Sequence, residues 1–181
     1  MSDELLRALR RTWEASGLRE DEARYRHELE RRVSPLVDVT LASTDEGIEQ
    51  GADAFVEVLG RLEPTPRFDE DAAASLVHAV REALMNGSHH GAAPIRLCVR
   101  IVEGALHATI TDGGRGFDHR PYTAFWPAWS RANPPDPSVR GPSPPGRPPG
   151  GLGFVLLFRF CDEVRWNEAG NEVTLVKRLP P

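Results

Sequence analysis

The pattern of apolar and polar residues along the chain predicts five short β-strands. In the first, Leu36-Val-Asp-Val-Thr-Leu-Ala42, apolar and polar residues alternate, which is typical of a strand with one buried face. The second and third are apolar runs hinged at Glu103-Gly104, and the last two predict a closing hairpin around residues 167–171. The five segments span residues 36–42, 95–102, 105–111, 163–166 and 172–177.

Three further segments predict helices, over residues 45–62, 69–89 and 152–161, the last of them a continuous apolar run opened by glycines and so a buried helix. On the second, one side of the helical wheel, expected to pack against the sheet, carries Ala73, Leu76, Val77, Val80 and Leu84. The opposite side carries Ser75, His78, Glu82, Asn86 and His89. The order of elements predicts an α/β two-layer sandwich, in which a mixed sheet has helices on one face.

Two regions lie outside this pattern. Residues 1–34 predict an N-terminal helical extension to a domain over residues 35–181. Its apolar residues at helical spacing are Leu5, Leu6, Leu9 and Trp13, then Tyr25, Leu29 and Val33. This extension either packs on the domain as a helical pair or contributes a dimerising helix. Residues 118–149 hold 10 of the 16 prolines and predict a long loop without helix or central strand, either functional or disordered.

Composition narrows the class of protein. The 181 residues are 40% hydrophobic and 27% charged, as in a soluble globular protein, and the net charge of −5 gives no electrostatic case for binding nucleic acid or anionic membranes. No apolar run approaches the roughly 20 residues of a membrane span, and the N-terminus lacks a signal-peptide apolar region. Because Cys98 and Cys161 lie in apolar runs without metal-ligand spacing, we expect two reduced core cysteines in a cytoplasmic protein.

Glu82 and Asn86 lie one turn apart on the polar side of the helix over 69–89. One interpretation is that this face is solvated, as most polar helix faces are. The other is that both side chains point into a ligand cleft. There the asparagine oxygen would be a hard ligand for Mg²⁺, and the glutamate would orient or deprotonate a nucleophile.

Two glycine turns add candidate chemistry. Asp112 ends a strand and precedes Gly113-Gly114-Arg115-Gly116, which is either a plain turn or a place where the carboxylate accepts a hydrogen bond from an exocyclic amine such as that of adenine. Gly150-Gly151-Leu152-Gly153 opens a helix, and is either a flexible joint or an anion site made by backbone amides.

Other site types lack their motifs. The chain has no Gly-x-x-x-x-Gly-Lys-Ser/Thr for a P-loop, no Gly-x-Gly-x-x-Gly after the first strand for a dinucleotide site, and no Gly-x-Ser-x-Gly nucleophile turn. His89 and His90 face different directions on a helix, without a third ligand, so we do not expect a metal pair there.

The motifs Glu82-x-x-x-Asn86, Asp112-x-Gly114-x-Gly116 and Gly151-x-Gly153 occur in an order that resembles the GHKL ATPase superfamily, which has the Bergerat ATP-binding fold. Its members include histidine-kinase catalytic domains, gyrase B and MutL. Residues 82–91 and the C-terminal stretch 161–177 resemble, within it, bacterial anti-sigma factor serine kinases of the RsbW and SpoIIAB type. The resemblance covers about residues 36–178.

This resemblance implies roles for the motif residues. Glu82 would be the general base, Asn86 the Mg²⁺ ligand and Asp112 the acid that binds adenine. Gly114 and Gly116 would form the first glycine turn; Gly151, Leu152 and Gly153 would form the phosphate-facing turn. Residues 118–149 would be the ATP lid, with Arg140 and Arg147 as candidates for phosphate contact.

The implied function is an ATP- and Mg²⁺-dependent protein serine/threonine kinase that phosphorylates a STAS-domain anti-anti-sigma partner and sequesters a regulatory partner such as a sigma factor. The long lid, Gly87 in place of the family's usual alanine and the added N-terminal segment depart from the pattern. They leave open a nucleotide-gated binding module without turnover. A histidine-kinase remnant is a weaker alternative, since the N-terminal segment offers only His27 as a phosphoacceptor. The lid aromatics Phe125, Trp126 and Trp129 either form a docking surface or anchor the lid on its own domain.

Overall fold

The computed structural model describes residues 35–62, 68–132 and 152–180. In these ranges the elements are, in order, β1 (Val37–Leu41), α3 (Asp45–Arg61), α4 (Glu70–His90), β2 (Ile95–Val102), β3 (Ala105–Thr111), α5 (Arg120–Ala132), α6 (Leu152–Phe160), β4 (Glu163–Trp166) and β5 (Glu172–Arg178). The five predicted strands and three predicted helices are confirmed to within one or two residues. The helices predicted in the N-terminal extension lie outside the described residues.

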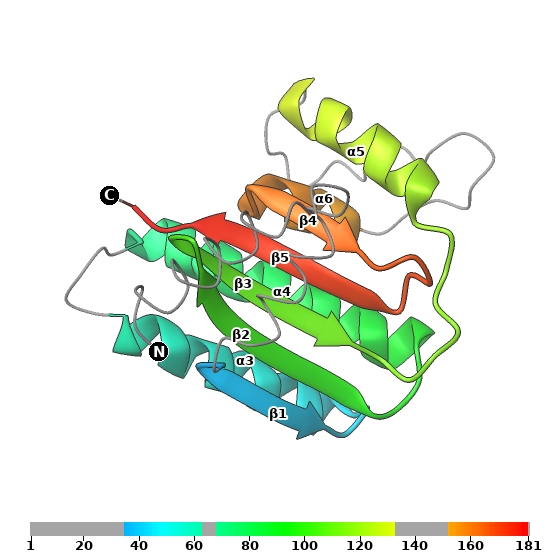
Figure 1. The fold of residues 1–181 in the computed structure, drawn as a ribbon, viewed down its shortest axis with the longest axis horizontal. Helices are drawn as coiled ribbons and strands as arrows, with labels where there is room; N and C mark the ends of the chain where they lie inside the picture. The colour runs from blue at the N-terminus through cyan, green and yellow to red at the C-terminus, as the bar shows by residue number, and fades with distance from the viewer. Residues whose placement is uncertain (1–34, 63–67, 133–151, 181) are drawn as a thin grey trace, which may run out of the picture.

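The strands form one sheet in the order β1-β2-β3-β5-β4 (Figure 1). All four strand pairs are antiparallel, so the prediction of a mixed sheet was wrong. The reason lies in the connections. β1 and β2 are joined through two helices, each of which reverses the chain direction, and the pairs β2–β3 and β4–β5 are hairpins.

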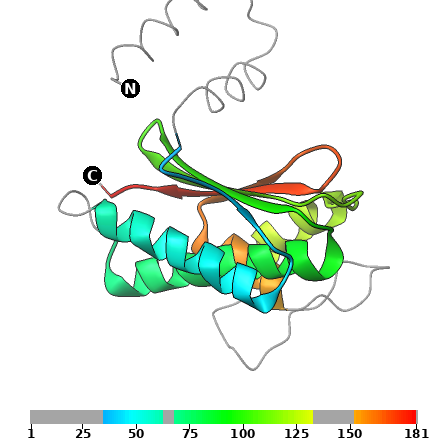
Figure 2. The ribbon, with the colours of Figure 1, turned by 90° about the horizontal axis from the view of Figure 1, so that it is seen from below.

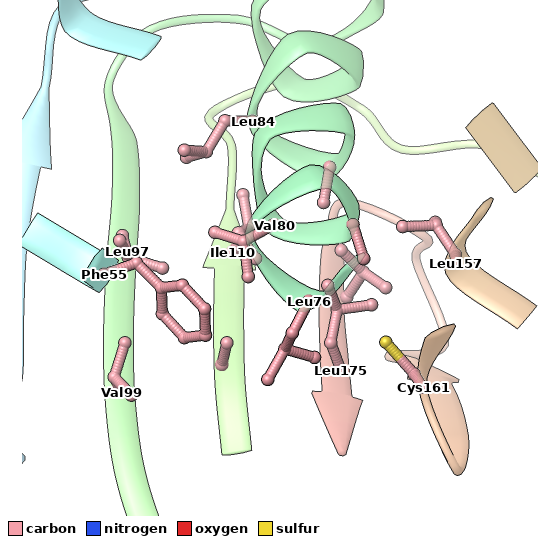
Figure 3. Close-up of a cluster of buried hydrophobic side chains, with 14 of the residues drawn as sticks. Phe55, Leu76, Val80, Leu84, Leu97, Val99, Ile110, Leu157, Cys161 and Leu175 are labelled. Carbon is pink, nitrogen blue, oxygen red and sulfur yellow. The ribbon is translucent and has the colours of Figure 1, made fainter. Parts of the chain in front are cut away.

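The helices α3, α4 and α6 cover one face of the sheet, so the predicted two-layer α/β sandwich is confirmed (Figure 2). Between the layers lies a core in which Phe55, Val80, Leu84, Leu97 and Leu157 are at most 1% exposed (Figure 3). Burial of each such side chain contributes about 1.5–3 kcal/mol. The apolar side of α4 predicted from the helical wheel is therefore the side that faces the sheet.

Both long helices begin at a side-chain cap. The Thr44 hydroxyl accepts a hydrogen bond from the Gly47 N–H (3.1 Å), and the Asp69 carboxylate accepts one from the Ala72 N–H (2.6 Å). Within the described part of the chain, no helix is long and apolar enough to span a bilayer.

Residues 120–132 form helix α5, where the proline content predicted a loop, so that prediction was wrong. Pro121 lies in the first turn, where a helix needs no N–H donor. Pro127 lies inside the helix, at a cost of about 3 kcal/mol. Trp126 beside it is fully buried, and an indole of 150–250 Å² at about 25 cal/mol per Å² offsets that cost. Trp126 therefore anchors α5 on its own domain, and the Trp129 side chain lies outside the described side chains.

Candidate functional site

A pocket of about 530 Å³ lies beside α4, between the start of α6 and the adjoining ends of β3 and β5. It brings together residues from three sequence motifs that are far apart in the chain. The predicted site residues that line it are Glu82, Asn86, Asp112, Gly116 and Gly153. The polar side of α4 is therefore not merely solvated, because its two central residues open into this pocket.

Glu82 is half-buried and lies directly against the first turn of α6. A methyl group in place of the Gly153 hydrogen would overlap the Glu82 carboxylate, so glycine is required for this close approach. Burial raises the pKa of Glu82, and the nearby His89 and His90 oppose that shift by favouring the ionised form. The result is a carboxylate that binds a proton more readily than an ordinary glutamate and is placed where a helix begins.

Asp112 follows the end of β3 and turns back against the end of α4. Its carboxylate accepts a hydrogen bond from the Gly114 N–H (2.7 Å), and the next residue, Gly113, donates its N–H to the Ala92 carbonyl (2.7 Å). A methyl group at Gly91 would overlap the Asp112 carboxyl group. The carboxylate is thus held in one place, and Gly114 supports it without lining the pocket.

The turn after Asp112 interlocks with the turn between β4 and β5. Gly116 has φ +73° and Gly170 has φ +81°, a region that side chains other than glycine rarely adopt. A methyl group at Gly116 would overlap the Ala169 carbonyl, and one at Gly170 would overlap the Phe117 carbonyl. Both glycines are therefore needed for the backbones to approach each other.

Asn171 ties these two turns together, and its role was not predicted from the sequence. Its backbone carbonyl accepts from the Asp112 N–H (2.9 Å), and its side-chain amide donates to the carbonyls of Asp112 and Gly114 (both 3.3 Å). Asn167 in turn fixes Asn171, since the two side chains are hydrogen-bonded at 2.8 Å. The sequence indicated a hairpin turn here, but no local signal gives the partner of a turn.

An aromatic wall formed by Phe117, Tyr122, Phe154 and Trp166 closes one side of the pocket, and it too was missed. Tyr122 and Phe154 stack at 4.6 Å between ring centroids, and Phe154 lies 5.7 Å from Trp166. Phe117 is edge-on to Tyr122, Phe154 and Trp166. One signal was available, because an aromatic residue directly follows Gly116 and Gly153. The wall joins α5, α6 and β4 around the pocket.

The remaining predicted site residues are placed as follows. Leu152 is the first residue of α6, and its side chain is not among the described side chains. Gly151, Arg140 and Arg147 lie outside the described residues. His89 and His90 line the pocket rim and are exposed.

The fold and pocket together define a two-layer α/β domain with a pocket between its helical layer and one end of the sheet. Residues 41–177 match the family model of the histidine kinase-like ATPase domain, so the chain belongs to that family. Membership confirms the predicted GHKL superfamily and implies ATP as the ligand.

Among solved structures, a chain in the crystal structure of the SiaB–SiaC complex from Pseudomonas aeruginosa has this fold. The TM-score is 0.59 at 16% sequence identity, with 83% of this chain and 94% of that chain covered. At that identity the likeness shows the fold alone, and it confirms the predicted Bergerat architecture. The comparison with curated proteins gives no significant match.

Proposed function

We propose that this protein is an ATP-dependent serine/threonine kinase of the anti-sigma factor type, which phosphorylates a STAS-domain anti-anti-sigma partner and sequesters a regulatory partner such as a sigma factor. The observation that supports it most is the convergence of Glu82, Asn86, Asp112 and Gly153 on one pocket. In this proposal Glu82 is the general base, Asn86 is the metal ligand and Asp112 is the acid that recognises adenine. Gly153 lies in the first turn of the helix that faces the phosphates.

The Asp112 end would recognise adenine. A fixed carboxylate oxygen accepts a hydrogen bond from the exocyclic amine, and the bare glycine backbone leaves space for the base. The apolar and aromatic residues along the pocket, including Ile110 and Phe117, would contact the faces and edges of the ring.

The donor set near Asn86 fits Mg²⁺. Mg²⁺ keeps several waters and is bound by one or two protein oxygens together with substrate phosphates. Asn86 offers an amide oxygen, and the described side chains contain no group of three His, Cys, Asp or Glu residues that would hold a metal by themselves. When bound, Mg²⁺ would neutralise charge on the phosphates.

Glu82 would act as the general base. The hydroxyl oxygen of the partner's serine forms a bond to the γ-phosphorus, and the bond from that phosphorus to the bridging oxygen breaks, releasing ADP. The hydroxyl proton passes to Glu82, whose raised pKa suits it to take that proton. A protein partner is in keeping with the SiaB–SiaC complex, an assembly of two proteins with a chain of this fold.

Calorimetry with ATP tests the pocket first. Asp112→Asn should weaken Mg-ATP and Mg-ADP binding roughly ten- to hundredfold, since a hydrogen bond to a charged group contributes about 1.5–3 kcal/mol. Asn86→Ala should weaken Mg-ATP binding more than binding of ATP in the presence of a chelator. Asp53→Asn, an exposed change on α3, is the matched control. Equal nucleotide affinity in all four proteins would refute the pocket assignment.

Phosphotransfer to a STAS-domain protein tests the chemistry. Wild-type protein should produce phosphoserine on the partner, and Glu82→Gln should lower the rate by about 10²–10⁴-fold while nucleotide still binds. Nucleotide binding without phosphotransfer by the wild type would favour the nucleotide-gated binding module. Undiminished phosphotransfer by Glu82→Gln would remove Glu82 from its role.

A further inference from the structure

The face of the sheet opposite the helices, here called the outer face, carries the side chains that alternate with those of the core. The strand register places on it Cys98, Arg100 and Val102 of β2, Ala105, His107 and Thr109 of β3, and Thr174 and Val176 of β5. Figure 2 shows that the described helices all lie on the other side of the sheet. Among described residues, no helix therefore packs on the outer face.

Part of the outer face is nevertheless buried. Cys98 is 5% exposed, Val102 7%, Ala105 9%, His107 8% and Val176 5%, and these five residues are called the outer patch. Four of them are linked by the pairs Val102–Ala105 and His107–Val176, and Cys98 lies opposite Thr109, the next residue of the outer face after His107 on β3. None of them belongs to the core cluster between the sheet and the helices. The outer patch is thus a second buried centre, apolar except for His107, on the opposite side of the sheet.

The other end of the outer face has the opposite character. There Arg96 forms an exposed ion pair with Asp38 (2.5 Å), and the Thr111 hydroxyl donates to the Glu172 carboxylate (3.0 Å). An antiparallel sheet with one solvated face is expected to look like this along its whole length. The outer patch departs from that pattern, which indicates that something covers it.

We propose that residues 1–34 of the same chain cover the outer patch. This segment leads directly into β1, and the chain joins the sheet next to the patch, where the Leu36 N–H donates to the carbonyl of Val99 (2.8 Å), the neighbour of Cys98. The segment supplies the apolar residues that such a cover needs: Leu5, Leu6, Leu9, Trp13, Tyr25, Leu29 and Val33.

Length and composition favour this occupant over a second copy of the chain. The patch spans β2, β3 and β5, roughly 10 Å across at about 4.8 Å per strand spacing. A helix of residues 18–33 would be roughly 24 Å long, ample to cross it. The apolar stripe of that piece is narrow on a charged background, as suits a helix that lies on a small patch with its other sides in water. This inference does not depend on the proposed function.

The two cysteines, one on each side of the sheet, serve as probes of accessibility in the 181-residue chain. Cys98 is in the outer patch, whereas Cys161 is in the core on the helical side (Figure 3), and burial raises the pKa of both thiols, that of Cys161 to about 12. Alkylation by iodoacetamide under native conditions, with both cysteine peptides quantified by mass spectrometry, reports separately on the two sides of the sheet.

In wild-type protein both cysteines should be protected. We expect at least one of two double variants, Leu9→Ala/Trp13→Ala or Tyr25→Ala/Leu29→Ala, to accelerate Cys98 alkylation about tenfold or more while Cys161 stays protected. The control Glu22→Ala/Glu30→Ala removes charges from the same segment and should leave Cys98 protected. Alanine is used because it loosens the contact without adding a charge.

Three outcomes of this alkylation experiment would overturn the proposal. They are rapid alkylation of Cys98 in wild type, no acceleration in either double variant, or equal acceleration of Cys98 and Cys161. Dilution distinguishes cover by the chain's own segment from cover by a second copy of the chain. Protection of Cys98 in protein that analytical ultracentrifugation shows to be monomeric supports cover by the chain's own segment. Protection that disappears as a dimer dissociates would assign the cover to a second copy and reject the proposal.

Discussion

The two ends of the pocket are built differently. At the Asp112 end, hydrogen bonds between Asn171 and the backbone join two turns. Gly116 lies so close to the Ala169 carbonyl that an added Cβ would overlap it. At the Glu82 end, a side chain on one helix rests against the first turn of another. A backbone contact cannot give way cheaply, whereas a glutamate side chain can rotate. The Asp112 end is therefore the rigid end of the pocket, and the Glu82 end is the one whose geometry small changes can shift.

Gly116→Ala is the change from which we expect the largest effect. The methyl group would overlap the Ala169 carbonyl, and a positive φ adds roughly 1–2 kcal/mol for a residue with a Cβ. The turn must open, so we expect about 2–4 kcal/mol lower unfolding free energy and loss of nucleotide binding. Urea unfolding and calorimetry measure the two effects.

The matched control is Gly104→Ala. Gly104 has φ +76°, close to that of Gly116, but no atom lies within 4 Å of the position of an added Cβ. It should lose only the backbone term, about 1–2 kcal/mol, and keep nucleotide affinity. If the two variants behaved alike, the interlocked turns would not be what holds the Asp112 end.

Gly153→Ala should separate transfer from binding. Its methyl group would meet the tip of the Glu82 side chain, which can move aside, so stability should change by less than about 1 kcal/mol. The displaced carboxylate should lower the phosphotransfer rate about ten- to hundredfold, because small misplacements of a catalytic group are costly. Rates at saturating ATP, beside calorimetric affinities, check this.

Gly60→Ala on α3 is the matched control for Gly153→Ala, because both glycines are helical and no atom lies within 4 Å of an added Cβ at Gly60. It should keep the wild-type rate. A Gly153→Ala protein with normal phosphotransfer would show that the contact between Glu82 and α6 has no part in the chemistry.

Asn171→Ala probes the brace behind the Asp112 end and should have a moderate effect. Two side-chain hydrogen bonds to turn carbonyls and one accepted from the Asn167 amide are lost, at about 0.5–1.5 kcal/mol each. Because the two bonds to carbonyls are long, we expect about 1.5–3 kcal/mol lower stability and weaker nucleotide binding, with an unchanged transfer rate at saturation. Glu168→Ala, an exposed change in the same turn, is the control. A fall in the saturated rate without loss of affinity would contradict this division of roles.

The contrast between local and long-range information also explains what the sequence could predict. The periodicity of α4 was sufficient to place Glu82 and Asn86 on the side away from the core, and the strands followed from their apolar runs. Helix α5 was missed because proline content is a local signal, whereas the burial of Trp126 depends on the tertiary packing of α5, which contacts α6. The two turn carbonyls that the Asn171 amide binds lie 57 and 59 residues away, so no pattern near residue 171 contains them.

The smallest expected effect is a pH dependence of stability that arises from Glu82. Its pKa is raised, first because burial penalises the charged carboxylate, while His89 and His90 act in the opposite direction. The folded protein therefore binds this proton more tightly than the unfolded chain does. The stabilisation is fully present below the ordinary pKa of glutamate, and it is lost as pH rises through the raised value.

Glu82→Gln removes this titration, so its unfolding free energy relative to wild type should rise across that pH window and then level off. Because Glu82 is half-exposed, solvent screening keeps the change below about 1 kcal/mol. Urea unfolding of both proteins from pH 4 to 8 measures it, with Glu168→Gln as the control for loss of one carboxylate. A relative stability that falls with rising pH would mean that the folded pocket favours the charged form of Glu82. The Glu82 end of the pocket would then be suited to binding a cation rather than to accepting a proton.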